Sequence, residues 1–103
     1  METSSRLDRA FRLFDGAHRE DPRTVSTGAG EVPWSLHYHR RMSRWLDRLA
    51  PEASEPLLLA ARCQHIRRWT VPRTRYPEGK IGYKQWRRDL ARFHGEEAAK
   101  LCI

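Results

Sequence analysis

The sequence predicts an all-α protein, a small bundle of about four helices. A chain of 103 residues is long enough for one domain with a single modest core. In four segments apolar residues recur every three or four positions, as they do on one face of a helix. No run alternates apolar and polar residues long enough to predict a useful strand. We therefore expect residues 1–103 to form a single helical domain.

The first helix is predicted from Ser5 to His18. Its apolar face consists of Leu7, Ala10, Phe11 and Phe14. Asp21 precedes Pro22 and therefore disfavours a helical conformation there. The following segment is rich in Ser, Thr and Gly, so we expect a mobile loop before the next helix.

The second helix is predicted from Pro33 to Leu49, because proline is favoured in a first helical turn. Its expected buried stripe is Tyr38, Met42, Trp45, Leu46 and Leu49. The third helix, Glu55–Trp69, begins after the capping residue Ser54. Because its first turns are apolar on every side, we expect it at the centre of the bundle.

A loop is predicted from Thr70 to Gly79, and a fourth helix from about Gly82. Its inner face would carry Tyr83, Trp86, Leu90 and Phe93. Gly95 is a candidate kink or stop. The apolar pattern continues without a cap into the last residues, so the bundle resembles a truncated one.

The positive charge of the chain is concentrated in one segment. The net charge is +7, but the segment from Arg62 to His94 has ten basic and two acidic residues, a local charge of +8. Such a segment attracts phosphate-bearing partners, either nucleotides or nucleic acid. Codon bias explains why 17 of the 20 basic residues are Arg, but it does not explain the clustering.

The candidate site joins the end of the third helix to the fourth. His65 and His94 are the candidate catalytic pair, for proton transfer or metal binding, because both lie near helix ends among basic residues. The candidate ligand-binding residues are Arg41, Arg62, Arg68, Trp69, Arg73, Tyr76, Tyr83, Trp86 and Arg87. Arginine makes paired hydrogen bonds to phosphate oxygens. The alternative is that the aromatic residues and His65 belong to the core.

Other functional classes have little support. Cys63 and Cys102 form neither a disulfide framework nor a zinc motif, so the reducing cytoplasm is the expected compartment. No apolar run is long enough to span a membrane. His37 and His39 point to different sides of a helix and do not chelate one ion together.

Three strings resemble one family of uncharacterised helical proteins. They are His39-Arg40-Arg41-Met42-Ser43, Ala60 through Trp69, and Arg73 through His94 with its Tyr76-Pro77, Gly82-Tyr83 and Trp86-Arg87 pairs. On these motifs the chain resembles the domain-of-unknown-function 4202 family, some members of which carry a glutamyl-tRNA-synthetase-like name. Members are longer, and this chain is similar to their N-terminal half.

A second, looser resemblance is to the HD phosphohydrolases, in which a His-Asp pair at the end of a central helix binds a divalent metal. Here Ile66 follows His65, and Arg67 comes next, so the aspartate is missing. A site rich in guanidinium groups repels a divalent cation unless carboxylates balance it. The resemblance implies a divalent metal cofactor, which this departure leaves open.

Three functions are consistent with the sequence. The first is a helical domain that binds a phosphorylated small molecule or nucleotide, as an HD-like phosphohydrolase relative. The second is an RNA- or tRNA-binding module with Trp69, Tyr76 and Trp86 as stacking surfaces. The third is a helical fragment that completes its bundle with a protein partner or a second copy.

Overall fold

The computed structural model describes residues 2–102, with side chains described from Arg6 to Leu101. The elements are α1 (Glu2–His18), β1 (Thr24–Thr27), β2 (Gly30–Pro33), α2 (Trp34–Leu49), α3 (Glu55–Cys63), the single-turn 3₁₀ helices η1 (Arg68–Thr70) and η2 (Arg73–Arg75), and α4 (Lys80–Cys102). All four predicted helices are present, and the described part of the chain is mostly helical. Its dimensions are 48 × 31 × 27 Å.

The expectation that the segment after α1 contains no strand is wrong, because β1 and β2 form an antiparallel hairpin. Thr27 pairs with Gly30 across a two-residue turn, and the Thr27 hydroxyl closes it by accepting from the Ala29 N–H and donating to the Gly30 carbonyl. Val25 faces Val32 in the ladder. Four residues in each strand are too few for a clear alternating pattern, but these β-branched residues favour an extended backbone.

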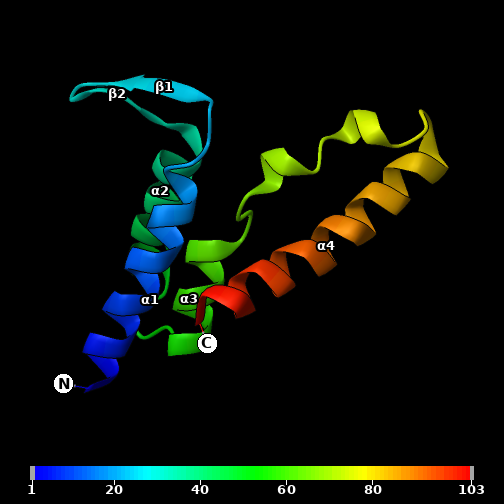
Figure 1. The fold of residues 1–103 in the computed structure, drawn as a ribbon. Helices are drawn as coiled ribbons and strands as arrows, with labels where there is room; N and C mark the ends of the chain where they lie inside the picture. The colour runs from blue at the N-terminus through cyan, green and yellow to red at the C-terminus, as the bar shows by residue number, and fades with distance from the viewer. Residues whose placement is uncertain (1, 103) are drawn as a thin grey trace.

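The closest helix packing involves α1, α2 and α3. α1 and α2 lie side by side, and α3 packs against both of them (Figure 1). α4 contacts α1 through its C-terminal part, whereas its N-terminal part extends away from the other helices (Figure 1). A segment with the two 3₁₀ turns connects α3 to this distant end of α4.

The apolar core is small and lies between α1, α3 and the end of α4. Phe14, Ala17 and Ile66 are buried in it, and Ala10, Leu59, Cys63, Ala98 and Leu101 pack around them. α3 is not the fully buried central helix that the sequence predicted, since none of its residues is fully buried. The face of α3 that points away from α1 and α2 is only partly covered, because α4 diverges from it.

The predicted buried stripe of α2 is only partly correct, since Tyr38, Met42 and Leu46 are half-buried. The buried residues of this helix are Ser35, Leu36, His39 and Ser43. Trp45 is 50% exposed and Leu49 77% exposed. The helix turns its small polar face inward because that face completes a hydrogen-bonded cluster with α1 and α3, described below.

α3 ends at Cys63, six residues before the predicted end at Trp69. The His65 N–H donates to Nε2 of His39, at 3.0 Å, so it does not continue the helical ladder. The next hydrogen bonds are of the tighter i→i+3 type, from Ile66 to Cys63 and from Arg68 to His65. Arg67 then adopts a left-handed conformation with φ of 52°, so the backbone leaves the direction of α3 at this residue.

α4 begins at Lys80 and continues through Gly95, so the predicted stop at that glycine is wrong. The glycine that the fold requires is Gly82, where a methyl group would overlap the backbone carbonyl of Pro77. This close approach fixes the connecting segment against the first turn of α4.

Candidate functional site

Four of the predicted site residues lie around one cavity. His65 and Arg68 come from the turn after α3, and Arg87 and His94 come from α4. The cavity has a volume of about 250 Å³ and is completed by Gln64, Leu90 and Ala91. We call it the His/Arg cavity. The structure thus brings together both candidate histidines and two of the candidate arginines.

The two imidazole rings are close neighbours. Their centroids are 5.8 Å apart, with an angle of 46° between the ring planes. Nε2 of His94 is buried and has no hydrogen-bond partner in the described part of the chain. A buried polar atom without a partner costs about 1–3 kcal/mol, so such an atom marks a site where a partner is expected.

Both imidazoles are neutral at pH 7. Burial lowers the pKa of His94 to about 4, and the charges of His65, Arg68 and Arg87 act in the same direction. The pKa of His65 is lowered first by burial and then by Arg68 and Arg87. A neutral imidazole has one N–H donor and one acceptor nitrogen, so each ring is able to exchange a proton with a ligand.

The two guanidinium groups of the cavity are not used in ion pairs within residues 6–101. Arg68 lies over the ring of Trp86, with its Cζ 5.1 Å from the ring centroid. Trp86 is held in turn by a 2.8 Å hydrogen bond from its Nε1 to the Val71 carbonyl. Trp86 therefore orients Arg68 and is not an open surface for a ligand.

Arg62 lies elsewhere, and its side chain is 12% exposed. Its Nε and Nη2 donate to the two carboxylate oxygens of Asp15, each at 2.9 Å, and its Nη1 donates to Ser43. This pairing ties α3 to α1 and α2, and Arg62 does not line the His/Arg cavity. The structure therefore separates Arg62 from the other candidate arginines.

Arg73 and Tyr76 organise the connecting segment. Arg73 donates to the carbonyls of Tyr76, Pro77 and Gly79 at 2.9–3.3 Å. Tyr76 donates its hydroxyl to Asp89 at 2.6 Å, and this hydrogen bond raises the pKa of Tyr76. Arg73 therefore fixes the fold of the connecting segment itself, and Tyr76 ties that segment to α4. Neither side chain lines the His/Arg cavity.

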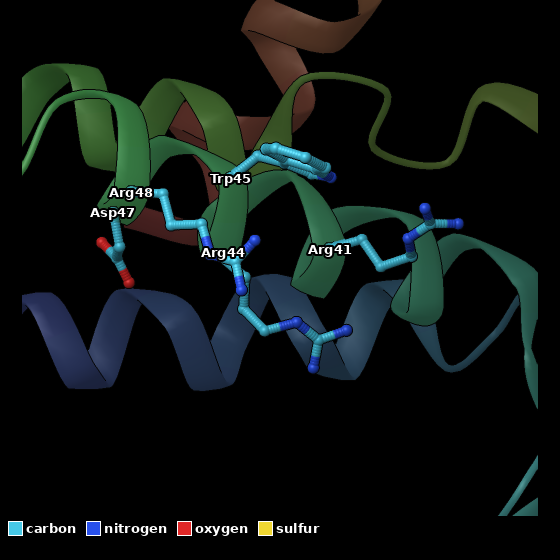
Figure 2. Close-up of a pocket in the computed structure, with 5 residues that line it drawn as sticks. All are labelled: Arg41, Arg44, Trp45, Asp47 and Arg48. Atoms are coloured by element: carbon cyan, nitrogen blue, oxygen red, sulfur yellow. The ribbon is translucent and has the colours of Figure 1, made fainter.

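Three further candidates also lie outside this cavity. Trp69 is partly buried in η1. Tyr83 is 47% exposed, and its ring lies 6.0 Å from that of Trp86. Arg41 is on α2, where it lines a separate hollow with Arg44, Trp45, Asp47 and Arg48 (Figure 2).

Sequence reasoning missed a second histidine cluster, which lies in the interior between α1, α2 and α3. His18 and His39 are fully buried and stacked, with ring centroids 3.8 Å apart. His39 donates from Nδ1 to the Ser35 carbonyl at 2.7 Å, and His18 donates from Nε2 to the Arg62 carbonyl, also at 2.7 Å. The Ser35 hydroxyl lies 3.0 Å from Nδ1 of His18. With Asp15 and Arg62 these residues form what we call the buried polar cluster.

A sequence signal for this cluster existed. Ser35, His39 and Ser43 recur every four residues and therefore share one face of α2. Beside them, Asp21 accepts from the Ser35 N–H and from Arg23, which fixes the start of α2 against the end of α1. A helix face of small polar residues with one histidine is equally compatible with a hydrogen-bonded interior and with a solvent-exposed surface.

The residues present do not fit the divalent metal implied by the HD-like resemblance. Among the side chains described, no three His, Cys, Asp or Glu groups are arranged to hold a metal ion. His65 is followed by the buried Ile66, and its nearest charged neighbours in the cavity are arginines. No helix in residues 2–102 is long and apolar enough to cross a membrane.

Comparison with known proteins gives one result. The model of DUF4202, a domain of unknown function, matches residues 8–103. Neither the curated proteins nor the solved structures give a significant match. Since the matched region covers almost all of its sequence, the chain belongs to the DUF4202 family.

Proposed function

We propose that the chain binds a phosphorylated ligand, with the phosphoryl group in the His/Arg cavity. One observation carries this proposal. Two guanidinium groups without ion-pair partners in residues 6–101 line the same cavity as a buried imidazole nitrogen that lacks a hydrogen-bond partner. The ligand class that satisfies both is an anion with several hydrogen-bonding oxygens.

Phosphate fits this chemistry better than a simple halide or a carboxylate. Each guanidinium is able to donate two parallel hydrogen bonds, and a phosphoryl group has three acceptor oxygens that serve both guanidinium groups at once, whereas a carboxylate has two and a halide is a single centre. The neutral His94 supplies a further donor or acceptor at Nε2, depending on its tautomer. A volume of about 250 Å³ is below the roughly 300–1,000 Å³ of a site for a whole drug-sized ligand, so the cavity suits a phosphoryl group with little else.

We propose binding as the function; hydrolysis of a bound phosphoester is a separate activity, which an assay with a phosphate monoester measures. His65 and His94 are close enough to serve one bound group, and neutral imidazoles are suited to proton transfer at pH 7. The metal-binding donor set of an HD phosphohydrolase is missing among the described side chains. The proposal therefore places no metal-dependent step in this cavity.

The test is a titration with inorganic phosphate and with a simple phosphate monoester, followed by calorimetry. Replacing Arg68 or Arg87 by Ala is expected to weaken binding by about 1.5–3 kcal/mol, because each removes a charge-assisted hydrogen bond. Arg88→Ala is the matched control, since Arg88 is an exposed neighbour on the same helix outside the cavity lining. Equal small losses for all three variants would mean that only overall charge matters, and would refute the site.

A further inference from the structure

A larger cavity lies next to the His/Arg cavity, along α2. It has a volume of about 460 Å³ and is lined by Trp34, His37, Tyr38, Arg41, Met42 and Trp45. A third hollow of about 350 Å³ adjoins it, and all five of its lining side chains come from α2 (Figure 2). Arg41 and Trp45 line both hollows, so the indole of Trp45 stands between them.

The Trp45 indole is available to a ligand. It is 50% exposed, and its one ring contact within the described residues is the Arg48 guanidinium, 5.7 Å from its centroid. The Tyr38 ring, in contrast, stacks on two other rings. Its centroid is 5.2 Å from that of Trp34 and 5.3 Å from that of His65. An exposed indole offers a large flat face on which an aromatic ligand is able to stack, and tryptophan is enriched at binding interfaces for this reason.

Unpaired positive charge surrounds this indole. Arg41 and Arg44 make no hydrogen bond or ion pair within residues 6–101, and Asp47 is the one acidic side chain lining either hollow. A second copy of the chain would bring the same guanidinium groups against each other. The surface is therefore complementary to a ligand that is both anionic and aromatic.

The α2 hollows and the His/Arg cavity share a wall. Tyr38 lines the larger α2 hollow, and its ring stacks on His65, which lines the His/Arg cavity. From Tyr38 to Trp45 the helix advances seven residues, or about 10 Å at 1.5 Å per residue. That length corresponds to about three nucleotides at the 3.4 Å spacing of stacked bases in one strand.

We propose that the ligand is a short single-stranded nucleic acid, whose terminal phosphate enters the His/Arg cavity and whose bases stack on Trp45. This inference rests on the proposed function and names its ligand class. The linking phosphates would lie against Arg41 and Arg44, and the sequence-tolerant stacking surface would be the indole. An acidic peptide would meet the same guanidinium groups but would leave the indole face without an aromatic partner.

The experiment measures fluorescence anisotropy of six-nucleotide RNA and DNA oligomers labelled at one end. The other end carries either a phosphate or a hydroxyl, in 5′ and 3′ versions. We expect the phosphorylated oligomer to bind at least tenfold more tightly than its hydroxyl twin. Trp45→Ala is expected to weaken oligomer binding at least fivefold, as loss of one stacked base does. Trp45→Phe is expected to recover part of the loss.

Inorganic phosphate, polyphosphate and Arg12→Ala are the controls. Trp45→Ala is expected to leave inorganic phosphate binding unchanged, because Trp45 does not line the His/Arg cavity. Arg12 is exposed on α1, so Arg12→Ala reports the effect of removing one charge. If Trp45→Ala weakens oligomer binding no more than Arg12→Ala does, the inference is overturned.

Two other results also overturn it. Polyphosphate or a poly-glutamate peptide that competes as well as the oligomer would show that bases are not recognised. Equal affinity for phosphate- and hydroxyl-ended oligomers would remove the terminal phosphate from the site. If inorganic phosphate binds and the oligomers do not, the inference alone fails, whereas absence of phosphate binding refutes the proposed function first.

Discussion

The buried polar cluster and the His/Arg cavity contain similar groups but differ in how many of those groups have partners. Each has two histidines and at least one arginine. In the buried polar cluster both ring nitrogens of His39 are within 3.0 Å of a hydrogen-bond partner, and Arg62 has a bidentate carboxylate. In the cavity, Nε2 of His94 has no partner, and neither guanidinium is in an ion pair within residues 6–101. Completed hydrogen bonding therefore separates residues that hold the fold from residues that are placed to hold a ligand.

The largest expected effect is on the buried polar cluster, from Asp15→Ala. Burial alone raises the pKa of Asp15, but hydrogen bonding and the charge of Arg62 outweigh this and lower it, so the ion pair forms at neutral pH. Removing the carboxylate leaves a nearly buried guanidinium uncompensated, which costs about 3–5 kcal/mol. Urea denaturation followed by circular dichroism measures the loss, with Asp8→Ala on the exposed side of α1 as control. A loss as small as that of Asp8→Ala would contradict the structural role of the pair.

His39→Ala is expected to reduce the free energy of unfolding by about 1–3 kcal/mol. The substitution removes a buried acceptor from the His65 N–H and a donor from the Ser35 carbonyl, and each is left without its partner. The same denaturation measurement checks it. If stability were unchanged while phosphate binding disappeared, His39 would belong to the binding site. The distinction between the buried polar cluster and the His/Arg cavity would then be wrong.

Acidification is expected to destabilise the fold between pH 6.5 and 4. Burial, first, and the neighbouring histidine charges lower the pKa of His39 from 6.5 to about 3, and the pKa of His18 is also lowered by burial. In this pH range the unfolded chain binds protons that the folded chain does not. Stability is therefore fully present above pH 6.5. Below that pH the free energy of unfolding falls by up to about 1.4 kcal/mol per pH unit for His39, and protonation of His18 adds a loss in the same direction.

Denaturation curves at pH 7, 6 and 5 measure this slope. Asp15 and Asp21 have pKa values below 3.8 in the folded chain, so their protonation does not account for a loss at pH 5. A free energy of unfolding that stays constant from pH 7 to pH 5 would contradict the neutral, buried state of His18 and His39.

The smallest expected effect on stability comes from His94→Ala. Its Nε2 has no hydrogen-bond partner to lose, so the free energy of unfolding should change by about 1 kcal/mol or less. Phosphate binding, in contrast, should be lost in the calorimetric titration. A large loss of stability with normal phosphate binding would place His94 with the structural histidines.

The sequence predicted the existence of the four helices because their apolar spacing is long and regular. It did not predict which face of α2 is buried. Tyr38, Met42 and Trp45 are more apolar than Ser35, His39 and Ser43. The small polar face is nevertheless inside because His18, Arg62 and the His65 N–H form hydrogen bonds with it. Those partners lie 17 or more residues away, so local hydrophobicity does not report them.

The candidate site was predictable in part from the spacing of its residues, but the sequence did not show which arginines belong to it. Arg87 and His94 are seven residues apart and share one face of α4, and the structure places them around one cavity with His65 and Arg68 from the turn after α3. His94 lies within α4, so its predicted position near a helix end is wrong. Arg62 has the same chemistry in the same basic segment, but its partner is Asp15, 47 residues earlier. Composition does not indicate which arginine meets a carboxylate.

His65 belongs to both clusters, its backbone to one and its side chain to the other. Because its N–H is held by His39 and its ring rests on Tyr38, the imidazole is oriented before any ligand arrives. A preorganised group loses little conformational entropy on binding, which favours affinity. The interior hydrogen bond of His65 thereby sets the geometry of the cavity, so a substitution at His39, although outside the cavity lining, is expected to change ligand affinity as well as stability.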